Sequence, residues 1–384
     1  MELQGLKYLV VGAGFFGSVL AERIAADLGE RVLVIDKRPH TGGNSHSEDD
    51  PATGIECHLY GSHIFHTSDE EVWRYLCRFT DWNSYRHRVL TLFDGKVYQM
   101  PINLATINSF YGLQLDPQQA QDFIRAEMER EGIGEPGNLE EKAVSLVGRP
   151  LYEAFVKGYT IKQWETDPRL LPAEIITRLP FRFGYKSDYF NDRWQGIPWQ
   201  GYAALFKNIL DHPNIEVALD TDFFAIRDRI PAGCKVIYTG AIDRFFDFRF
   251  GELGWRTLDF EKEVCQVGDF QGTTVMNYAE AAVPFTRIHE FRHYHDERSY
   301  PADRTVIYRE FSRRARRQDD PYYPINTVKD RELLQEYQAA AALVPDFVFG
   351  GRLGSYAYLD MDKAIAAALA TYQRDIKGAG RPLL

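Results

Sequence analysis

Three glycines and an aspartate near the start of the chain have the types and spacing of a site for nucleotide phosphates. Gly12, Gly14 and Gly17 form a G-x-G-x-x-G pattern. In such a pattern the first glycine permits a tight turn, the second lets the backbone approach a pyrophosphate, and the third lets a helix pack closely on a strand. Asp36 follows at the separation of about 20 residues at which a carboxylate accepts hydrogen bonds from ribose hydroxyls. We therefore expect an adenine dinucleotide to bind here.

The segments that must position these residues can be read from the apolar pattern. Residues 7–11 predict a strand, residues 18–28 an amphipathic helix, and residues 31–35 a second strand that ends at Asp36. The N-terminus of the helix then faces the phosphates. Strands at 235–238 and 347–349, each followed by glycine, predict further parts of the same unit. A helix over residues 363–372, capped by Asp360 or Asp362, would present its positive end to a reduced flavin.

A pair of adjacent glycines distinguishes FAD-binding sites from NAD-binding sites. Gly42-Gly43-Asn44 follows Asp36 closely, and many FAD proteins extend the motif in this way so that more backbone can pass the phosphates. NAD dehydrogenases usually lack the extension. The expected cofactor is therefore FAD.

Composition excludes several classes of protein. The 384 residues carry a formal charge of −10, which disfavours nucleic acid as a partner, and no apolar run is long enough to cross a membrane. The four cysteines are widely separated, so we expect neither disulfides nor a zinc site. His63 and His66 are three apart, but no third ligand is evident, and we expect no metal. The composition indicates a cytoplasmic enzyme, with homo-oligomerisation left open.

Four further strings resemble the UDP-galactopyranose mutase family, in its bacterial form. They are Gly61-Ser62-His63-Ile64-Phe65-His66-Thr67, Gly158-Tyr159-Thr160-Ile161-Lys162-Gln163-Trp164, Val283-Pro284-Phe285-Thr286-Arg287, and the stretch from Gly351 through Tyr358 to Met361. The similarity runs from about Tyr8 to the C-terminal helix. It implies an isomerase that interconverts UDP-galactopyranose and UDP-galactofuranose, a step of galactofuranose supply for surface polysaccharide. Reduced FAD would form a covalent adduct with the anomeric carbon without net redox, so an electron donor is also implied.

The resemblance assigns roles to individual residues. Arg178 and Arg287 would stabilise the leaving diphosphate, because a guanidinium meets phosphate oxygens two at a time. His63, against the flavin, and Tyr358 complete the predicted catalytic set. The predicted substrate-binding residues are His87, Phe155, Tyr159, Thr160, Trp164, Tyr189, Asn277, Arg287, Tyr323 and Tyr358. The spacing of Phe155, Tyr159, Thr160 and Trp164 by itself favours a packed aromatic helix face over a ligand site.

The predicted cofactor-binding set joins the glycine motif to residues that the resemblance places on the flavin or the adenine end. Its members are Gly12, Gly14, Phe15, Phe16, Gly17, Asp36, Lys37, Gly43, Asn44, His63, Ile64, Asp222, Phe223, Thr239, Gly240, Arg352, Asp360 and Met361.

The expected fold class is α/β, with a discontinuous Rossmann-like FAD-binding domain, a helical insertion and an antiparallel β-sheet domain. The expected FAD domain comprises residues 1–85, 205–240 and 342–384. Residues 100–178 would form the insertion, with a mobile loop near 170–180, because segments such as 116–131 and 139–146 are rich in helix formers. Residues 86–99, 180–204 and 241–341 would build the sheet on the substrate side.

Two other functions remain open at this point. A flavin-dependent oxidoreductase of the amine-oxidase type would share the N-terminal motif and the Gly42-Gly43 pair. It would not need two phosphate-binding arginines. A module that senses UDP-sugars while retaining flavin is the non-enzymatic alternative.

Overall fold

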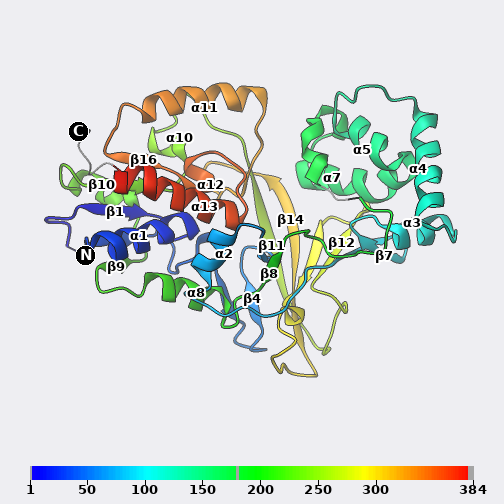
Figure 1. Ribbon diagram of the computed structural model, residues 1–384, viewed down its shortest axis with the longest axis horizontal. Coiled ribbons are helices and arrows are strands. Elements are labelled where there is room, and N and C mark those ends of the chain that lie inside the picture. Colours follow the sequence, from blue (N-terminus) through cyan, green and yellow to red (C-terminus); the bar gives the residue numbers. More distant parts are fainter. Residues whose placement is uncertain (1, 179–180, 379–384) are drawn as a thin grey trace.

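The computed structural model describes residues 2–178 and 181–378, with only the backbone of Thr177 and Arg178 (Figure 1). Its first layer is a five-stranded parallel sheet in the order β16-β10-β1-β2-β9. The strands are β1 (Tyr8–Val11), β2 (Val32–Ile35), β9 (Ile215–Ala218), β10 (Lys235–Tyr238) and β16 (Phe347–Phe349). Strands from both ends and the middle of the chain thus form one sheet, as the sequence predicts.

Helix α1 (Phe15–Leu28) packs against α8 (Gly201–Leu210) and α13 (Met361–Thr371) to cover this sheet. Apolar residues of the strands and helices, such as Val10, Val34, Leu20 and Ile365, are fully buried between them. Helix α1 begins three residues earlier than the sequence predicts, because Gly14 takes the N-cap position. The parallel sheet and its helices confirm the predicted Rossmann-like fold.

The second layer is a seven-stranded sheet in the order β15-β11-β14-β13-β12-β6-β7 (Figure 1). Its strands are β6 (Val89–Phe93), β7 (Lys96–Met100), β11 (Trp255–Cys265), β12 (Val275–Tyr278), β13 (Arg287–Glu290), β14 (Thr305–Arg314) and β15 (Tyr323–Pro324). Every neighbouring pair is antiparallel except β12 and β6, which run parallel. The parallel pair arises because β6 and β12 are contributed by segments far apart in the chain.

A helical region projects from the far side of this sheet (Figure 1). It contains α3 (Leu104–Tyr111), α4 (Pro117–Glu131), α5 (Leu139–Val147), α6 (Arg149–Leu151), the π-helical turn η2 (Tyr152–Lys157) and α7 (Gly158–Trp164). Asp116 and Gln119 form a reciprocal capping box at the start of α4, and Asn138 caps α5. Such caps satisfy amides that a helix leaves free, which explains why α4 and α5 begin where the sequence predicts.

Short elements connect the layers. They are β3 (Ser47–Asp49) paired with β4 (Glu56–His58), β5 (Phe65–Thr67) paired with β8 (Trp194–Gly196), and the helices α2 (Glu70–Leu76), α9 (Phe223–Ile226), α10 (Ile242–Phe245), α11 (Val328–Ala341) and α12 (Gly351–Gly354). The sequence places residues 194–196 in the sheet on the substrate side. In the structure β8 pairs with β5 in a separate two-stranded sheet. Within the described residues, no helix combines the length and apolarity needed to cross a membrane.

Candidate cofactor and substrate site

A cavity of about 610 Å³ opens at the carboxyl ends of the parallel strands. Val11 ends β1 and Gly12 follows it, Ile35 ends β2 and Asp36 follows it, and Thr239 follows β10. All five residues line the cavity. This edge of a parallel α/β sheet is where dinucleotides bind, because chain crossovers leave a crevice there. Cavities of this size suit a cofactor or another large ligand.

Two glycines of the predicted motif, Gly12 and Gly17, are required by close packing. Gly12 has a φ of +104°, and a Cβ there would lie 2.0 Å from Thr239 Oγ1. A Cβ on Gly17 would lie 2.0 Å from the carbonyl oxygen of Gly12. At Gly14 a Cβ would lie 3.9 Å from Gly43 Cα, so the two glycine segments approach one another at the cavity. A backbone bare of side chains therefore faces the space where phosphates would bind.

Asp36 lines the cavity and organises the turn itself. Its Oδ2 accepts a hydrogen bond from the Ala13 amide at 2.8 Å, and its Oδ1 accepts one from the Arg38 amide at 2.9 Å. Each carboxylate oxygen can accept more than one hydrogen bond. The predicted contact of Asp36 with a ribose stays a prediction.

Nearly all of the predicted cofactor-binding residues line this one cavity. They are Gly12, Gly14, Phe15, Phe16, Gly17, Asp36, Lys37, Gly43, Asn44, His63, Asp222, Phe223, Thr239, Gly240, Arg352 and Met361. Two predicted residues do not line it. Ile64 instead lies in the hydrophobic core.

The other exception is Asp360, which occupies the N-cap position of α13 without a capping hydrogen bond from its side chain. Asp362, the alternative cap, instead accepts hydrogen bonds from Thr67 Oγ1 and from the Lys363 amide. The predicted cap position is therefore confirmed at Asp360, but neither carboxylate makes a capping hydrogen bond. Met361 and Ala364, in the first turn of α13, line the cavity, so the positive end of the helix dipole is directed there.

His63 lines the cavity in a defined tautomer. Its Nδ1 lies 2.7 Å from the carbonyl oxygen of Gly61, which can only accept, so the ring donates from Nδ1. Burial lowers the pKa of His63 to about 4, so the ring is neutral near pH 7 and Nε2 is an acceptor. His66, three residues on, pairs with Asp192 at 2.8 Å, so the two histidines do not converge on a metal.

Arg352 connects the cavity to a pair of stacked tyrosines. It lines the cavity, and its guanidinium lies over the rings of Tyr323 and Tyr358, at 5.6 and 5.1 Å from their centroids. The two rings stack with centroids 5.7 Å apart. Burial raises the pKa of Tyr323, whereas the charges of Arg352 and Arg287 oppose this change. Tyr323 therefore lies within the electrostatic influence of both arginines.

Arg287 begins β13 and is fixed by two partners. Tyr159 of α7 accepts a hydrogen bond from its guanidinium, and Glu310 of β14 forms an ion pair with its Nε at 3.4 Å. Burial alone would raise the pKa of Glu310, but the charge of Arg287 and a hydrogen bond with His289 lower it to about 2. Burial also raises the pKa of Tyr159 to about 12. A guanidinium that is held charged and in place can bind an anion without reorganisation.

A hydrogen-bonded chain behind Arg287 was not anticipated from the sequence. Glu310 is ionised and can only accept, so His289 Nε2 donates to it over 3.0 Å, and His289 Nδ1 accepts from Ser62 Oγ. Tyr294 in turn donates to Ser62. Ser62 precedes His63, so the chain joins Arg287 to the turn that carries His63. A glutamate at an inward position of the apolar strand β14 was the available signal.

Asn277 and His87 are polar residues of the predicted substrate site, and they differ in whether their side chains have partners. Asn277 lies opposite Arg287 in the β12–β13 register, and its buried Oδ1 has no hydrogen-bond partner among the described residues. His87 is buried, with Nδ1 2.9 Å from the Tyr85 hydroxyl, and its ring contacts those of Tyr189 and Phe190. Burial lowers the pKa of His87 to about 3, so this ring is also neutral.

The aromatic residues of the helical region do not share one face. Phe155 lies in the π-helical turn η2 and is buried among the rings of Phe93, Tyr98 and Phe110. Phe155 is therefore packed against other aromatic rings, as its spacing alone favours. Thr160 is also buried, and Trp164 packs against the same core. Tyr159 alone of this group reaches Arg287, because the π-turn changes the angular spacing between residues 155 and 159.

Arg178 ends the 3₁₀ helix η4 (Ala173–Arg178). Its side chain lies outside the described part of the structure, so its predicted role stays a prediction. Ile176 of the same helix is buried in the core of the helical region. The segment expected to be a mobile loop thus contains a helical turn anchored by an apolar side chain.

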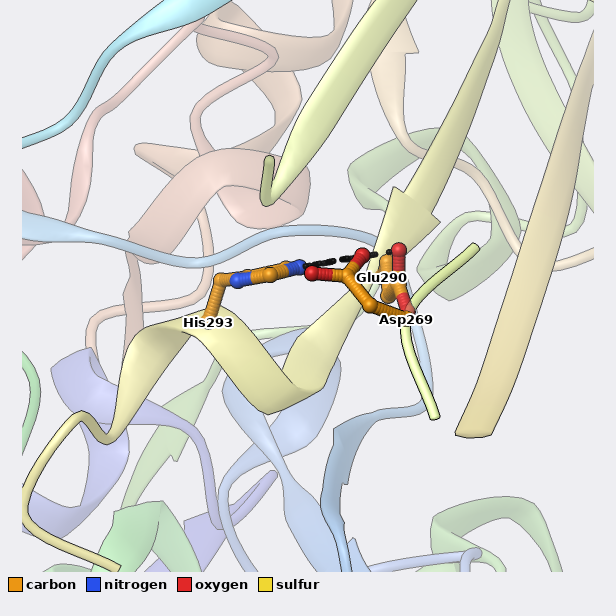
Figure 2. Close-up of side chains that lie close together, drawn as sticks. All are labelled: Asp269, Glu290 and His293. Atoms are coloured by element: carbon orange, nitrogen blue, oxygen red, sulfur yellow. Dashed lines mark hydrogen bonds and ion pairs between the residues drawn. The ribbon is translucent and has the colours of Figure 1, made fainter. Parts of the chain in front are cut away.

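One group of potential metal ligands occurs in residues 2–178 and 181–378, and it lies outside the cavity. Asp269, Glu290 and His293 direct their polar atoms at one another (Figure 2). Glu290 accepts from the amides of Phe270 and Gln271, each at 2.9 Å. Burial lowers the pKa of His293, but Glu290 and Asp269 outweigh it and raise the pKa overall. The two carboxylates therefore favour the protonated form of this imidazole.

Comparisons with known proteins identify two matching families and several relatives. A family model described as UDP-galactopyranose mutase matches residues 154–358, and one described as an NAD(P)-binding Rossmann-like domain matches residues 10–79. The chain is 44% identical to a protein named "Probable UDP-galactopyranose mutase" from Klebsiella pneumoniae, over 94% of this chain and 93% of the relative. It is 40% identical to a dTDP-fucopyranose mutase from Escherichia coli, over 97% and 98%.

A solved structure has a similar fold. The crystal structure of a reduced UDP-galactopyranose mutase aligns with a TM-score of 0.74 and 16% identity, covering 98% of this chain and 96% of that one.

Proposed function

The chain belongs to the UDP-galactopyranose mutase family, and on this premise we propose that it interconverts UDP-galactopyranose and UDP-galactofuranose. The observation that carries the proposal is the position of Arg287. This guanidinium is held by a buried carboxylate and by Tyr159, next to the stacked tyrosines at the cofactor cavity. An oxidoreductase of the amine-oxidase type would have no use for a preorganised anion site there.

FAD is the cofactor that the cavity suits. The bare glycine backbone at Gly12, Gly14 and Gly43 would hold its pyrophosphate, and the first turn of α13 would face the pyrimidine side of its ring system. When bound and kept reduced by an electron donor, FAD would supply the nucleophile that bonds covalently to the anomeric carbon of the sugar, with no net redox. His63 would orient the flavin through its fixed Nε2 acceptor.

The residues of this chain would do the rest by binding and charge. Arg287 would stabilise the negative charge that develops as UDP leaves, and Glu310 keeps it in place. The free Oδ1 of Asn277 would accept a hydrogen bond from the substrate. Tyr323 and Tyr358 would contact phosphate or sugar oxygens. Burial raises the pKa of Tyr323, so its hydroxyl remains a protonated donor near pH 7.

The proposed function is tested by turnover in two redox states. The protein is supplied with UDP-galactofuranose, and UDP-galactopyranose is followed by chromatography. We expect rapid conversion after reduction with dithionite and little conversion by oxidised protein. Equal rates in both states, or no conversion in either, would overturn the proposal.

A second substrate is favoured by one of the relatives. The dTDP-fucopyranose mutase is nearly as similar as the UDP-galactopyranose mutase, and it covers slightly more of the chain. Reduced protein should therefore also be given dTDP-fucopyranose, and the two kcat/KM values compared. A higher kcat/KM for the dTDP-sugar would retain the mutase chemistry and replace the substrate.

Arg178 gives a prediction that the structure leaves open. We propose that its guanidinium meets the diphosphate opposite Arg287. Replacement by alanine should lower kcat/KM by about 100-fold, the scale on which a preorganised charge acts, and leave flavin absorbance intact. The measurement is steady-state kinetics of the reduced enzyme, with Arg169→Ala as the control, because Arg169 is exposed and pairs with Asp167 of its own turn. Unchanged UDP affinity and rate would remove Arg178 from the site.

A further inference from the structure

Lys162 of helix α7 is held in an unusual way. Its Nζ donates hydrogen bonds to the carbonyl oxygens of Tyr278, Glu280 and Phe285, at 2.6, 2.9 and 3.0 Å. A lysine ammonium has three N–H donors, so these contacts use all of them. The three carbonyls belong to the end of β12 and the connection that leads to β13. One side chain therefore joins the helix to this connection.

The same connection meets α7 one turn earlier. Gly158 packs so closely that a Cβ would lie 2.3 Å from the carbonyl oxygen of Ala279 and 3.0 Å from the amide nitrogen of Ala281. Residues 158 and 162 are one helical turn apart and lie on the same face of α7. Together they form a junction, defined here as Gly158 and Lys162 against residues 278–285.

The junction stands between groups that would bind the substrate in the proposed function. Asn277 lies immediately before the connection, and Arg287 begins the strand that follows it. Tyr159, next to Gly158, accepts a hydrogen bond from Arg287 across the same gap. A displacement of α7 from the connection would therefore change the separation between Tyr159 and the two strand residues.

We propose that Lys162 is a positioning residue for the substrate: its three hydrogen bonds hold α7 against the β12–β13 connection so that Tyr159, Arg287 and Asn277 keep the spacing that binds the nucleoside diphosphate. The inference rests on the proposed function of this site. Lys162 touches none of the reacting atoms in this arrangement and acts through the backbone that carries the binding groups.

The ionisation of Lys162 provides a readout that a purely structural contact lacks. Burial lowers the pKa of Lys162 to about 8, although the negative charge of Glu280 opposes the change. Above that pH the amine has only two N–H donors for three carbonyls, so the junction loosens. The pKa of Lys162 in the folded protein lies below the ordinary value of 10.5, so the unfolded state binds more protons between about pH 8 and 10.5. Lys162 therefore makes the free energy of unfolding rise with pH over this range. Weaker binding in that range would thus not report unfolding.

The experiment compares Lys162→Met with Lys157→Met by titrating UDP calorimetrically into the flavin-bound protein. Lys157 lies just before α7 and pairs only with the exposed Glu153 among the interactions described, so its replacement is the matched control. We expect Lys162→Met to raise the Kd for UDP and the KM about tenfold and to change kcat by less than about threefold, as expected for a loss of uniform binding. Lys157→Met should leave all three within about twofold.

A second variant and the pH dependence of the Kd test the inference even if Lys162→Met fails to fold. Gly158→Ala opens the junction from its other contact and should raise the Kd for UDP in the same direction. The wild-type Kd should rise through about pH 8, and Lys162→Met should lack that rise. Deprotonation of the uracil ring is common to both proteins and cancels in the comparison. Arg287 and Tyr159 have raised pKa values and keep their protons in this range.

The outcomes separate this inference from the function on which it rests. Wild-type affinity in both Lys162→Met and Gly158→Ala would overturn the inference and leave the mutase proposal standing. A lower Tm with an unchanged Kd would show that the junction only stabilises the fold and would also overturn it. Failure of the wild-type protein to bind UDP would overturn the proposed function itself.

Discussion

Replacement of Arg287 by alanine is expected to abolish most turnover while the flavin stays bound. The residue lies outside the cavity that would hold the cofactor, and its guanidinium is fixed by Tyr159 and Glu310. Loss of a preorganised group that stabilises transition-state charge lowers kcat by a factor of about 100 to 1,000. The measurements are steady-state kinetics of the reduced protein and the visible absorbance of its flavin.

A control is needed because Arg287→Ala leaves Glu310 without its cation. Glu310 is buried, and a buried carboxylate without a partner destabilises the fold. Adding Glu310→Gln removes that charge, so the double variant should recover part of the Tm lost in the single variant without recovering kcat. Recovery of turnover in the double variant, or loss of flavin from the single one, would contradict a direct role of Arg287 in charge stabilisation.

Replacement of Gly12 by alanine is expected to prevent flavin binding. A side chain at a φ of +104° costs about 1 to 3 kcal/mol in backbone strain. The added Cβ would also lie 2.0 Å from Thr239 Oγ1. The turn must therefore move away from Thr239, which follows the neighbouring strand β10. Together these effects should weaken FAD binding by about 3 kcal/mol or more, which is about 100-fold. The ratio of flavin to protein absorbance after purification measures this loss.

Gly29→Ala is the matched control for this prediction. Gly29 also has a positive φ, +67°, but a Cβ there meets no atom within 4 Å. It ends helix α1, whose other end meets the cavity, so the same substitution should cost about 1 kcal/mol of stability and leave flavin bound. Full flavin occupancy in Gly12→Ala would show that the turn tolerates a side chain and that the close approach of backbone is not what binds the cofactor.

The local parts of the protein could be predicted from sequence because their signals are short in range. The turn from Gly12 to Gly17, the strand that ends at Asp36 and the pair Gly42-Gly43 all depend on neighbours in sequence, and each lies at the cavity. Helices α4 and α5 could be predicted equally well, since their caps and helix formers lie within the segments themselves. Strands β10 and β16 were found from apolar runs that end in glycine.

Spacing alone does not record how side chains pack. Phe155 and Tyr159 have the i to i+4 separation that favours one packed aromatic face, but Phe155 lies in a π-turn and packs into the core, whereas Tyr159 contacts Arg287. Asp360 has the position and residue type of a helix cap without the hydrogen bond. In each case the tertiary contacts, rather than the local preference, determined where the side chain lies.

The chain by itself thus determined a glycine turn and its acidic partner, because a motif encodes backbone geometry over a few residues. The arginines of the proposed anion site were assigned only through the resemblance to the family. The fold alone decided how Arg287 is held. Glu310 meets Arg287 only because β14 pairs with β13 in one register, and Lys162 meets the carbonyl of Phe285, 123 residues away, only because α7 packs on that connection. Contacts of this kind depend on the packing of distant elements, and no local pattern of residues records them.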